Sequence, residues 1–159
     1  GDAQARLDAL FASLTHSGLV ALQVAGTTQS DGFADCSEIF HERGGAAAGL
    51  HGFCFYTRQD RDRAKKAGRL ELAFWGAPEG ADADMVRVGE LIVRAAEAAG
   101  LPAAWNGSSA RRPTLRFSKL PKAGDGYAAP AFTNNAQALN VSVLLLSLYT
   151  SDAADDSLR

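Results

Sequence analysis

The sequence lacks long apolar runs and any strong excess of charge of one sign, and these absences exclude two classes of protein. No apolar run approaches the roughly 20 residues that a membrane-spanning helix needs, and no basic segment followed by an apolar one opens the chain as a secretory signal would. The 16 basic and 18 acidic side chains leave a net charge of −2, which is too small to favour general binding to nucleic acids or membranes. We therefore expect a soluble, cytoplasmic protein without a nucleic-acid or membrane partner.

The chain is equally poor in the residue patterns of catalysis and metal binding. It contains no HExxH, GxSxG, Walker or CxxC motif. Its two cysteines, Cys36 and Cys54, lie among aromatic residues in apolar segments, so we expect both in the core. His16 and His41 stand at predicted helix ends and His51 beside a predicted strand, without the spacing of a metal site. The sequence thus predicts no cofactor and no metal.

The other predicted helices and strands are arranged around one segment, residues 50–57, LHGFCFYT. Phe53 to Tyr56 are apolar at every position, which is typical of a strand that is covered on both faces. We predict that this segment is the central strand of a sheet.

Helical and strand patterns alternate along the chain on both sides of this strand. In the helix predicted at 32–43, Phe33, Cys36 and Phe40 are expected to share the inner face. The predicted elements are helices at 3–17, 32–43, 60–67 and 82–99, and strands at 19–25, 50–57, 70–75, 103–105 and 113–117, the last of them at a sheet edge. Because parallel neighbours need a crossover, this order predicts an α/β (α+β) fold with helices packed on a mixed, partly parallel four- to five-stranded sheet. We expect two layers, or three if the first helix crosses to the other face.

Residues 1–118 are predicted to form a single α/β domain, and residues 119–159 an irregular C-terminal extension. Proline, glycine and paired asparagines dominate up to Asn140, which is loop chemistry. The apolar run at 141–149 is either a buried strand or an exposed, aggregation-prone segment. The end also resembles a tail produced when sequencing-adapter DNA is translated, in which case residues from about 141 are not native. The start at Gly1 without methionine indicates a trimmed chain or a fragment that begins further upstream.

Four motifs in a fixed order carry a resemblance to a family of uncharacterised bacterial proteins known as a domain of unknown function. They are residues 25–33 (AGTTQSDGF), 52–60 (GFCFYTRQD), 70–76 (LELAFWG) and 105–108 (WNGS). The likeness covers roughly Arg6 to Phe117 and implies a single-domain bacterial protein with no known activity. Some relatives have a cysteine-rich segment where this chain has Thr27, Thr28 and Gln29, so no metal role is carried over.

The candidate binding residues all follow predicted strands. They are Gln29, Ser30, Asp31, Gln59, Asp60, Trp105 and Asn106. If the first two strands are parallel, the turns at 29–31 and 59–60 share one rim of the sheet, where ligands bind in open α/β folds. Each residue also has a structural interpretation, because aspartate caps helices, tryptophan packs in cores and Asn-Gly forms turns.

The sequence leaves two hypotheses of function. The first is a non-enzymatic module that binds a protein partner or a small polar ligand at this rim. The alternative is a hydrolase or transferase of unrecognised type that uses Asp31, Asp60 or His51 there. A basic stretch either binds phosphates or guards an edge strand against pairing, and the second interpretation is favoured in a slightly acidic chain. It consists of Arg111, Arg112, Arg116, Lys119 and Lys122.

Overall fold

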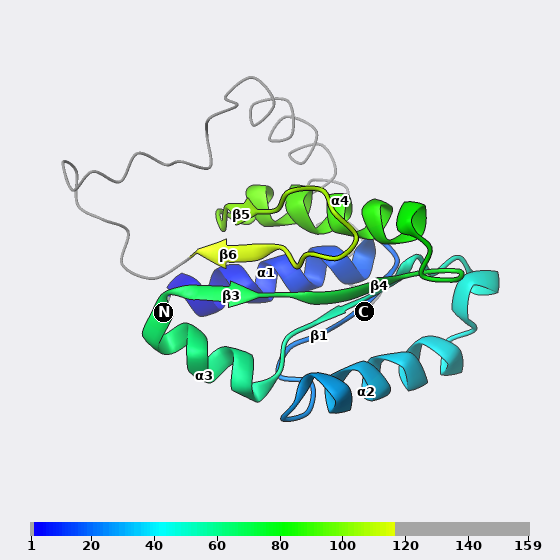
Figure 1. The fold of residues 1–159 in the computed structure, drawn as a ribbon, viewed down its shortest axis with the longest axis horizontal. Coiled ribbons are helices and arrows are strands. Elements are labelled where there is room, and N and C mark those ends of the chain that lie inside the picture. Colours follow the sequence, from blue (N-terminus) through cyan, green and yellow to red (C-terminus); the bar gives the residue numbers. More distant parts are fainter. Residues whose placement is uncertain (1, 117–159) are drawn as a thin grey trace, which may run out of the picture.

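The computed structural model describes residues 2–116 of the chain (Figure 1). Its helices are α1 (Asp2–His16), α2 (Gln29–Glu42), α3 (Arg58–Ala67) and α4 (Asp82–Ala98), with a 3₁₀ turn, η1, at Gly45–Ala48. Its strands are β1 (Leu19–Leu22), β2 (Gly52–Phe55), β3 (Arg69–Glu71), β4 (Ala73–Gly76), β5 (Ala103–Ala104) and β6 (Thr114–Arg116). None of the helices in this described part of the chain has the length and apolar character needed to cross a membrane.

The main sheet has the order β1-β2-β4, so the phenylalanine-rich strand is central as predicted. β1 pairs with β2 in parallel, with Val20 opposite Phe53, and β4 pairs with β2 in antiparallel, with Phe74 opposite Cys54. Every residue of β2 is buried. The expected mixed, partly parallel sheet with packed helices is confirmed.

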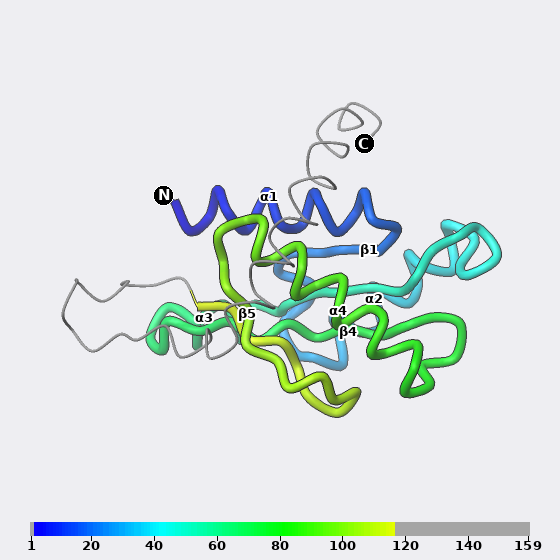
Figure 2. Tube along the Cα trace, turned by 90° about the horizontal axis from the view of Figure 1, so that it is seen from above, coloured from blue at the N-terminus to red at the C-terminus, as the bar shows by residue number. Residues whose placement is uncertain are grey.

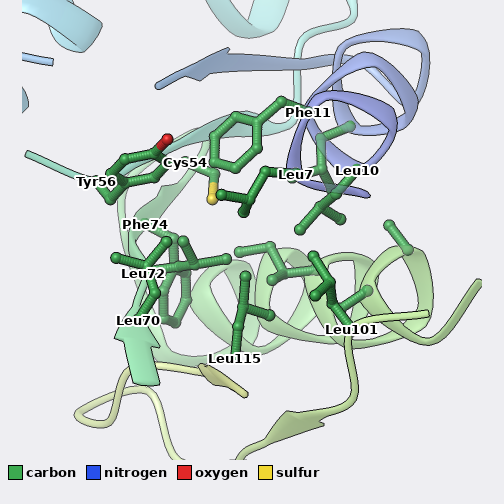
Figure 3. Close-up of a cluster of buried hydrophobic side chains, with 14 of the residues drawn as sticks. Leu7, Leu10, Phe11, Cys54, Tyr56, Leu70, Leu72, Phe74, Leu101 and Leu115 are labelled. Atoms are coloured by element: carbon green, nitrogen blue, oxygen red, sulfur yellow. The ribbon is translucent and has the colours of Figure 1, made fainter. Parts of the chain in front are cut away.

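Helices cover both faces of this sheet, which gives three layers (Figures 1 and 2). On one face α1 packs along β1 and α4 along β4, and the two helices contact each other. On the other face α2 packs against β1 and β2. Alternate residues of β2 therefore enter different cores, with Cys54 in the α1 and α4 core (Figure 3) and Phe53 and Phe55 in the α2 core.

A second small sheet, with the order β3-β6-β5, corrects two sequence predictions. The segment predicted as one strand at 70–75 divides between two sheets: it pairs with β6 up to Glu71, Leu72 N–H donates to Pro113 O at 2.9 Å, and from Ala73 it pairs with β2. The main sheet consequently has fewer strands than the four or five predicted. β6 is central in its sheet and not an edge strand, so Arg116 does not guard an edge.

The start of α2 also differs from the prediction. The helix begins at Gln29, because Thr28 caps it, and not near Gly32. Gly32 faces the sheet so closely that a Cβ there would lie 2.5 Å from the Phe55 ring. Phe33, predicted on the inner face, is 41% exposed, although Cys36 and Phe40 are buried as expected. The predictions for residues 119–159 lie outside the described part of the chain.

We expect neither cysteine to react with a thiol reagent in the native protein. Cys36 and Cys54 are fully buried, and burial raises the pKa of Cys36 to about 12 and the pKa of Cys54 well above its usual value. Because the thiolate is the reactive species, labelling with an aromatic disulfide at pH 8 should stay at background in buffer and reach both thiols after unfolding in guanidinium chloride. Rapid labelling in buffer would contradict a closed core around β2.

Candidate functional site

The rim predicted from the sequence exists, because β1 and β2 are parallel and end at the same edge of the sheet. The two loops that follow them are hydrogen-bonded to each other. Arg58 N–H donates to Gly26 O at 3.1 Å, and Gln59 N–H donates to Thr27 O at 3.3 Å. The starts of α2 and α3 therefore lie side by side.

Both helices begin with the same capping box, in which a threonine and an aspartate three residues later bond to each other's backbone N–H. In α3, Asp60 accepts from Thr57 N–H at 2.9 Å and the Thr57 hydroxyl accepts from Asp60 N–H at 3.1 Å. In α2 the equivalent distances for Asp31 and Thr28 are 3.4 and 3.3 Å. The structural interpretation of both aspartates as caps is confirmed.

These contacts leave no free donor at the start of α3. The first four N–H groups of a helix have no partner within it and are the groups that bind phosphates and other anions. In α3 those of residues 57 and 60 are taken by the capping box and those of residues 58 and 59 by the loop before α2. An anion therefore has no open helix N-terminus to bind in α3.

Arg112, which lies just before β6 of the second sheet, contacts this rim. Its guanidinium donates to the Gln29 side-chain oxygen and lies 3.9 Å from Asp60 Oδ1 and 3.7 Å from Glu71 Oε1. Asp60, which is 6% exposed, also accepts from Arg63 at 2.8 Å. The sequence favoured a role for Arg112 in guarding an edge strand, whereas the structure shows that it bonds to Gln29 and lies beside Asp60.

Trp105 and Asn106 lie beside α4 and serve as packing and turn residues. The Trp105 indole N–H donates to Arg111 O at 2.9 Å, and a Cβ at Gly89 would lie 2.4 Å from its ring. The Asn106 side chain accepts from Ser108 N–H at 2.9 Å. Within residues 2–116 neither residue shares a hydrogen bond with the rim, so the structure does not join them to Gln29, Ser30, Asp31, Gln59 and Asp60 in one site. Of those rim residues, Asp60 is buried and the other four are exposed.

His51 lies at the wrong end of β2 for chemistry at the rim. Its N–H donates to Gly18 O at 2.8 Å, just before the strand begins, whereas the rim follows the end of the strand. The four residues of β2 separate these ends by roughly 13 Å. The hypothesis that His51 acts at the same rim as Asp31 and Asp60 is therefore wrong. No group of three potential metal ligands occurs in the described part of the chain.

A pocket of about 240 Å³ lies between α1 and α3, next to the end of β2. It was not predicted from the sequence. Its lining residues are Ala3, Gln4, Leu7, Tyr56, Arg61, Ala64, Lys65 and Leu70. The start of α1 and the basic helix α3, which contribute most of them, lie close together in Figure 1.

One wall of the pocket is a closed network of polar side chains. The Tyr56 hydroxyl donates to Gln23 Oε1 at 2.8 Å, and the Gln23 amide donates to Asp8 Oδ1 at 2.9 Å. Gln4 donates to the same Asp8 oxygen at 2.8 Å. Hydrogen bonds from Gln23 and Gln4 lower the pKa of Asp8, and burial raises the pKa of Tyr56 to about 12. At neutral pH this wall holds one carboxylate with its partners and a neutral phenol.

The lining also includes two cations of α3, Arg61 and Lys65. Arg61 Nε is buried and has no hydrogen-bond partner among the described residues. A buried donor without a partner costs about 1–3 kcal/mol, and more when it is charged. The sequence contained a usable signal, because Arg61 and Lys65 lie on the same helix face as Ala64, three residues before it and one after it. From the sequence alone we interpret the charges of this helix as a solvated face and Ala64 and Ala67 as its inner side.

Comparison with known proteins agrees with the resemblance in the sequence motifs. Neither the curated proteins nor the solved structures gave a match to this chain. Residues 2–117 match the family described as Domain of unknown function (DUF6891). Because this match spans well over half of the chain, the chain belongs to that family.

Proposed function

We propose that this chain is a non-enzymatic module that binds a small polar ligand in the pocket between α1 and α3. The observation that carries the proposal is the composition of the pocket: an apolar floor that includes Leu7 and Leu70, with polar and charged side chains on its walls. Small-molecule sites are built in this way, mostly apolar with a few polar groups that orient the ligand.

The pocket is a better binding site than the rim because its polar groups are less completely used. At the rim, Asp31 and Asp60 each accept from a backbone N–H, and Arg112 already bonds to Gln29. A ligand there would have to break these bonds. In the pocket, Arg61 Nε has no partner to lose within the described residues.

The same contacts weigh against the hydrolase or transferase alternative. A general base must be free to take a proton from a substrate or water. The Asp60 carboxylate accepts from Thr57 N–H and Arg63, and His51 is too distant to assist either Asp60 or Asp31.

One observation favours the protein-partner version of the function. Phe33 is 41% exposed on α2, with its ring 5.0 Å from that of Phe53. A single exposed aromatic residue is ordinary on a protein surface, so the small-ligand version stands first.

A thermal-shift screen of the full chain against metabolites and metal ions tests this proposal. A ligand at a hundred times its dissociation constant stabilises the folded state by about 2.7 kcal/mol. The variant Ala3→Phe places a large side chain in the pocket wall, so it should abolish the shift given by a true ligand.

Ala5→Phe is the matched control, because Ala5 is exposed and does not line the pocket. It should retain the shift. A ligand whose shift survives Ala3→Phe binds elsewhere, and a screen without any shift would reject ligand binding and leave the protein-partner version.

A further inference from the structure

We infer that the ligand of this pocket is a small carboxylate with a compact apolar group, and that Arg61 binds its carboxylate. The inference rests on the proposed function and names the chemical class that the pocket selects. Three features carry it: the position of Arg61 in the pocket lining, the charge of α3, and the apolar floor of limited volume.

Arg61 supplies the recognition group. Guanidinium is always charged, and its planar set of N–H groups matches the two oxygens of a carboxylate. Arg61 lines the pocket, while its Nε is shielded from water and has no partner in residues 2–116. A ligand carboxylate would accept from the terminal guanidinium nitrogens, whereas a neutral ligand with an apolar edge would leave this charge without a counterion.

The surroundings of Arg61 favour an anion. The five basic and two acidic side chains of α3 give this helix a net charge of +3 in a chain whose net charge is −2. Lys65, one turn after Arg61, lines the same pocket. No acidic side chain is among the described residues that line the pocket, and Asp8, behind Gln4, is bonded to the amides of Gln4 and Gln23. A carboxylate is therefore attracted to the Arg61 wall.

The floor of the pocket determines which chemical group the ligand carries in addition to its carboxylate. Leu7, Ala64 and Leu70 are buried apolar side chains, and a second charged group placed against them would lose its hydration without a partner. The volume of about 240 Å³ equals that of roughly eight water molecules. The pocket thus fits a short aliphatic chain or a single ring attached to the carboxylate.

The α3 side of the pocket offers no phosphate site of the usual kind. Phosphate sites in proteins draw on several backbone N–H groups, typically at a helix N-terminus. The N–H groups at the start of α3 are all engaged by the capping box and the preceding loop. On this side of the pocket a ligand anion therefore depends on the side chains of Arg61 and Lys65.

The test is titration of the full chain with benzoate, benzamide and phenyl phosphate, followed by NMR chemical shifts. Benzoate and benzamide have nearly the same shape and differ in charge. We expect benzoate to bind at least roughly tenfold more tightly than benzamide, which lacks the charge that strengthens the hydrogen bonds to Arg61, and more tightly than phenyl phosphate. Hexanoate and hexanamide repeat the comparison with an aliphatic chain.

Two charge-removing variants of α3 distinguish a direct contact between Arg61 and the ligand from the general electrostatic field of the helix. Arg61→Gln should weaken benzoate binding by roughly tenfold or more. Lys66→Gln removes the same charge from an exposed position that does not line the pocket, and it should change affinity by less than about twofold, as screened surface charges do. Far-UV circular dichroism should show that both variants keep the native helix content.

The outcomes distinguish this inference from the proposed function. Equal binding of benzoate and benzamide, or benzoate binding unaffected by Arg61→Gln, would overturn the carboxylate assignment. Tighter binding of phenyl phosphate would replace it with a phosphate ligand. If other, neutral compounds bind and are blocked by Ala3→Phe, the pocket function stands while the carboxylate class fails.

Discussion

Replacing Phe53 by alanine should lower the free energy of unfolding by about 3–5 kcal/mol, the usual cost of removing a buried phenylalanine. Phe53 is 1% exposed in the central strand, and its ring is 5.4 Å from that of Trp75 and 6.3 Å from those of Phe40 and Phe55. Its removal leaves a cavity between α2 and the sheet. Because typical domains are stable by only 5–15 kcal/mol, this variant loses a large part of its stability.

Denaturant unfolding followed by tryptophan fluorescence measures this loss, since Trp75 stacks on Phe53. The matched control is Phe33→Ala in the same aromatic cluster. Phe33 is 41% exposed and contacts Phe53 edge-on at 5.0 Å, so its removal should cost about 0.5–1.5 kcal/mol. Equal losses for Phe33→Ala and Phe53→Ala would contradict the burial of the central strand.

Replacing Asp60 by alanine should lower the free energy of unfolding by about 2–3 kcal/mol. The change removes the acceptor for the Thr57 N–H, which is buried, and ends the contacts of Asp60 with Arg63 and Arg112. The loss of a cap costs about 0.5–2 kcal/mol, and a buried N–H left without a partner adds to it. Asp60→Asn keeps an acceptor oxygen and should recover part of the loss.

The twin capping box provides the control for this prediction. Asp31 makes the same contact at the start of α2 but is exposed, with a longer bond of 3.4 Å to Thr28 N–H. Asp31→Ala should therefore cost about 0.5–1 kcal/mol. Thermal or urea unfolding of both variants gives the difference. A smaller loss for Asp60→Ala than for Asp31→Ala would show that burial and the arginine contacts add nothing to the cap of α3.

Most elements could be predicted because their signals lie within a few neighbouring residues. The long helix was predicted at 82–99 and is found at Asp82–Ala98, since its apolar stripe and the following Gly100 and Pro102 are local features. The continuous apolar character of β2 likewise indicated a strand covered on both faces. The starts of α2 and α3 were predicted at residues 32 and 60, three and two residues too late, because the threonine-aspartate capping boxes that begin both helices were not recognised in the sequence.

The second sheet was not predicted, because the sequence pattern of a strand does not show which other strands pair with it. Residues 69–76 alternate without a break, yet their pairing changes from β6 to β2 at Leu72. That change depends on where residues 113–116 lie, and nothing local to 69–76 records it. The exposure of Phe33 was missed for a similar reason, because helical spacing gives a face of the helix but not how far the sheet extends beneath it.

The chain's own residue order thus indicated where most helices and strands form and which strand is central. It predicted that two loops share an edge of the sheet only if β1 and β2 are parallel, and the structure supplied that pairing. Only the packing of α1, α3 and the second sheet decided that Arg112 lies at that edge. The same packing brought Arg61 into one pocket with Tyr56 and Gln4. The physical reason is range: periodicity and capping act between residues a few positions apart, whereas a binding pocket joins side chains from segments far apart in the chain.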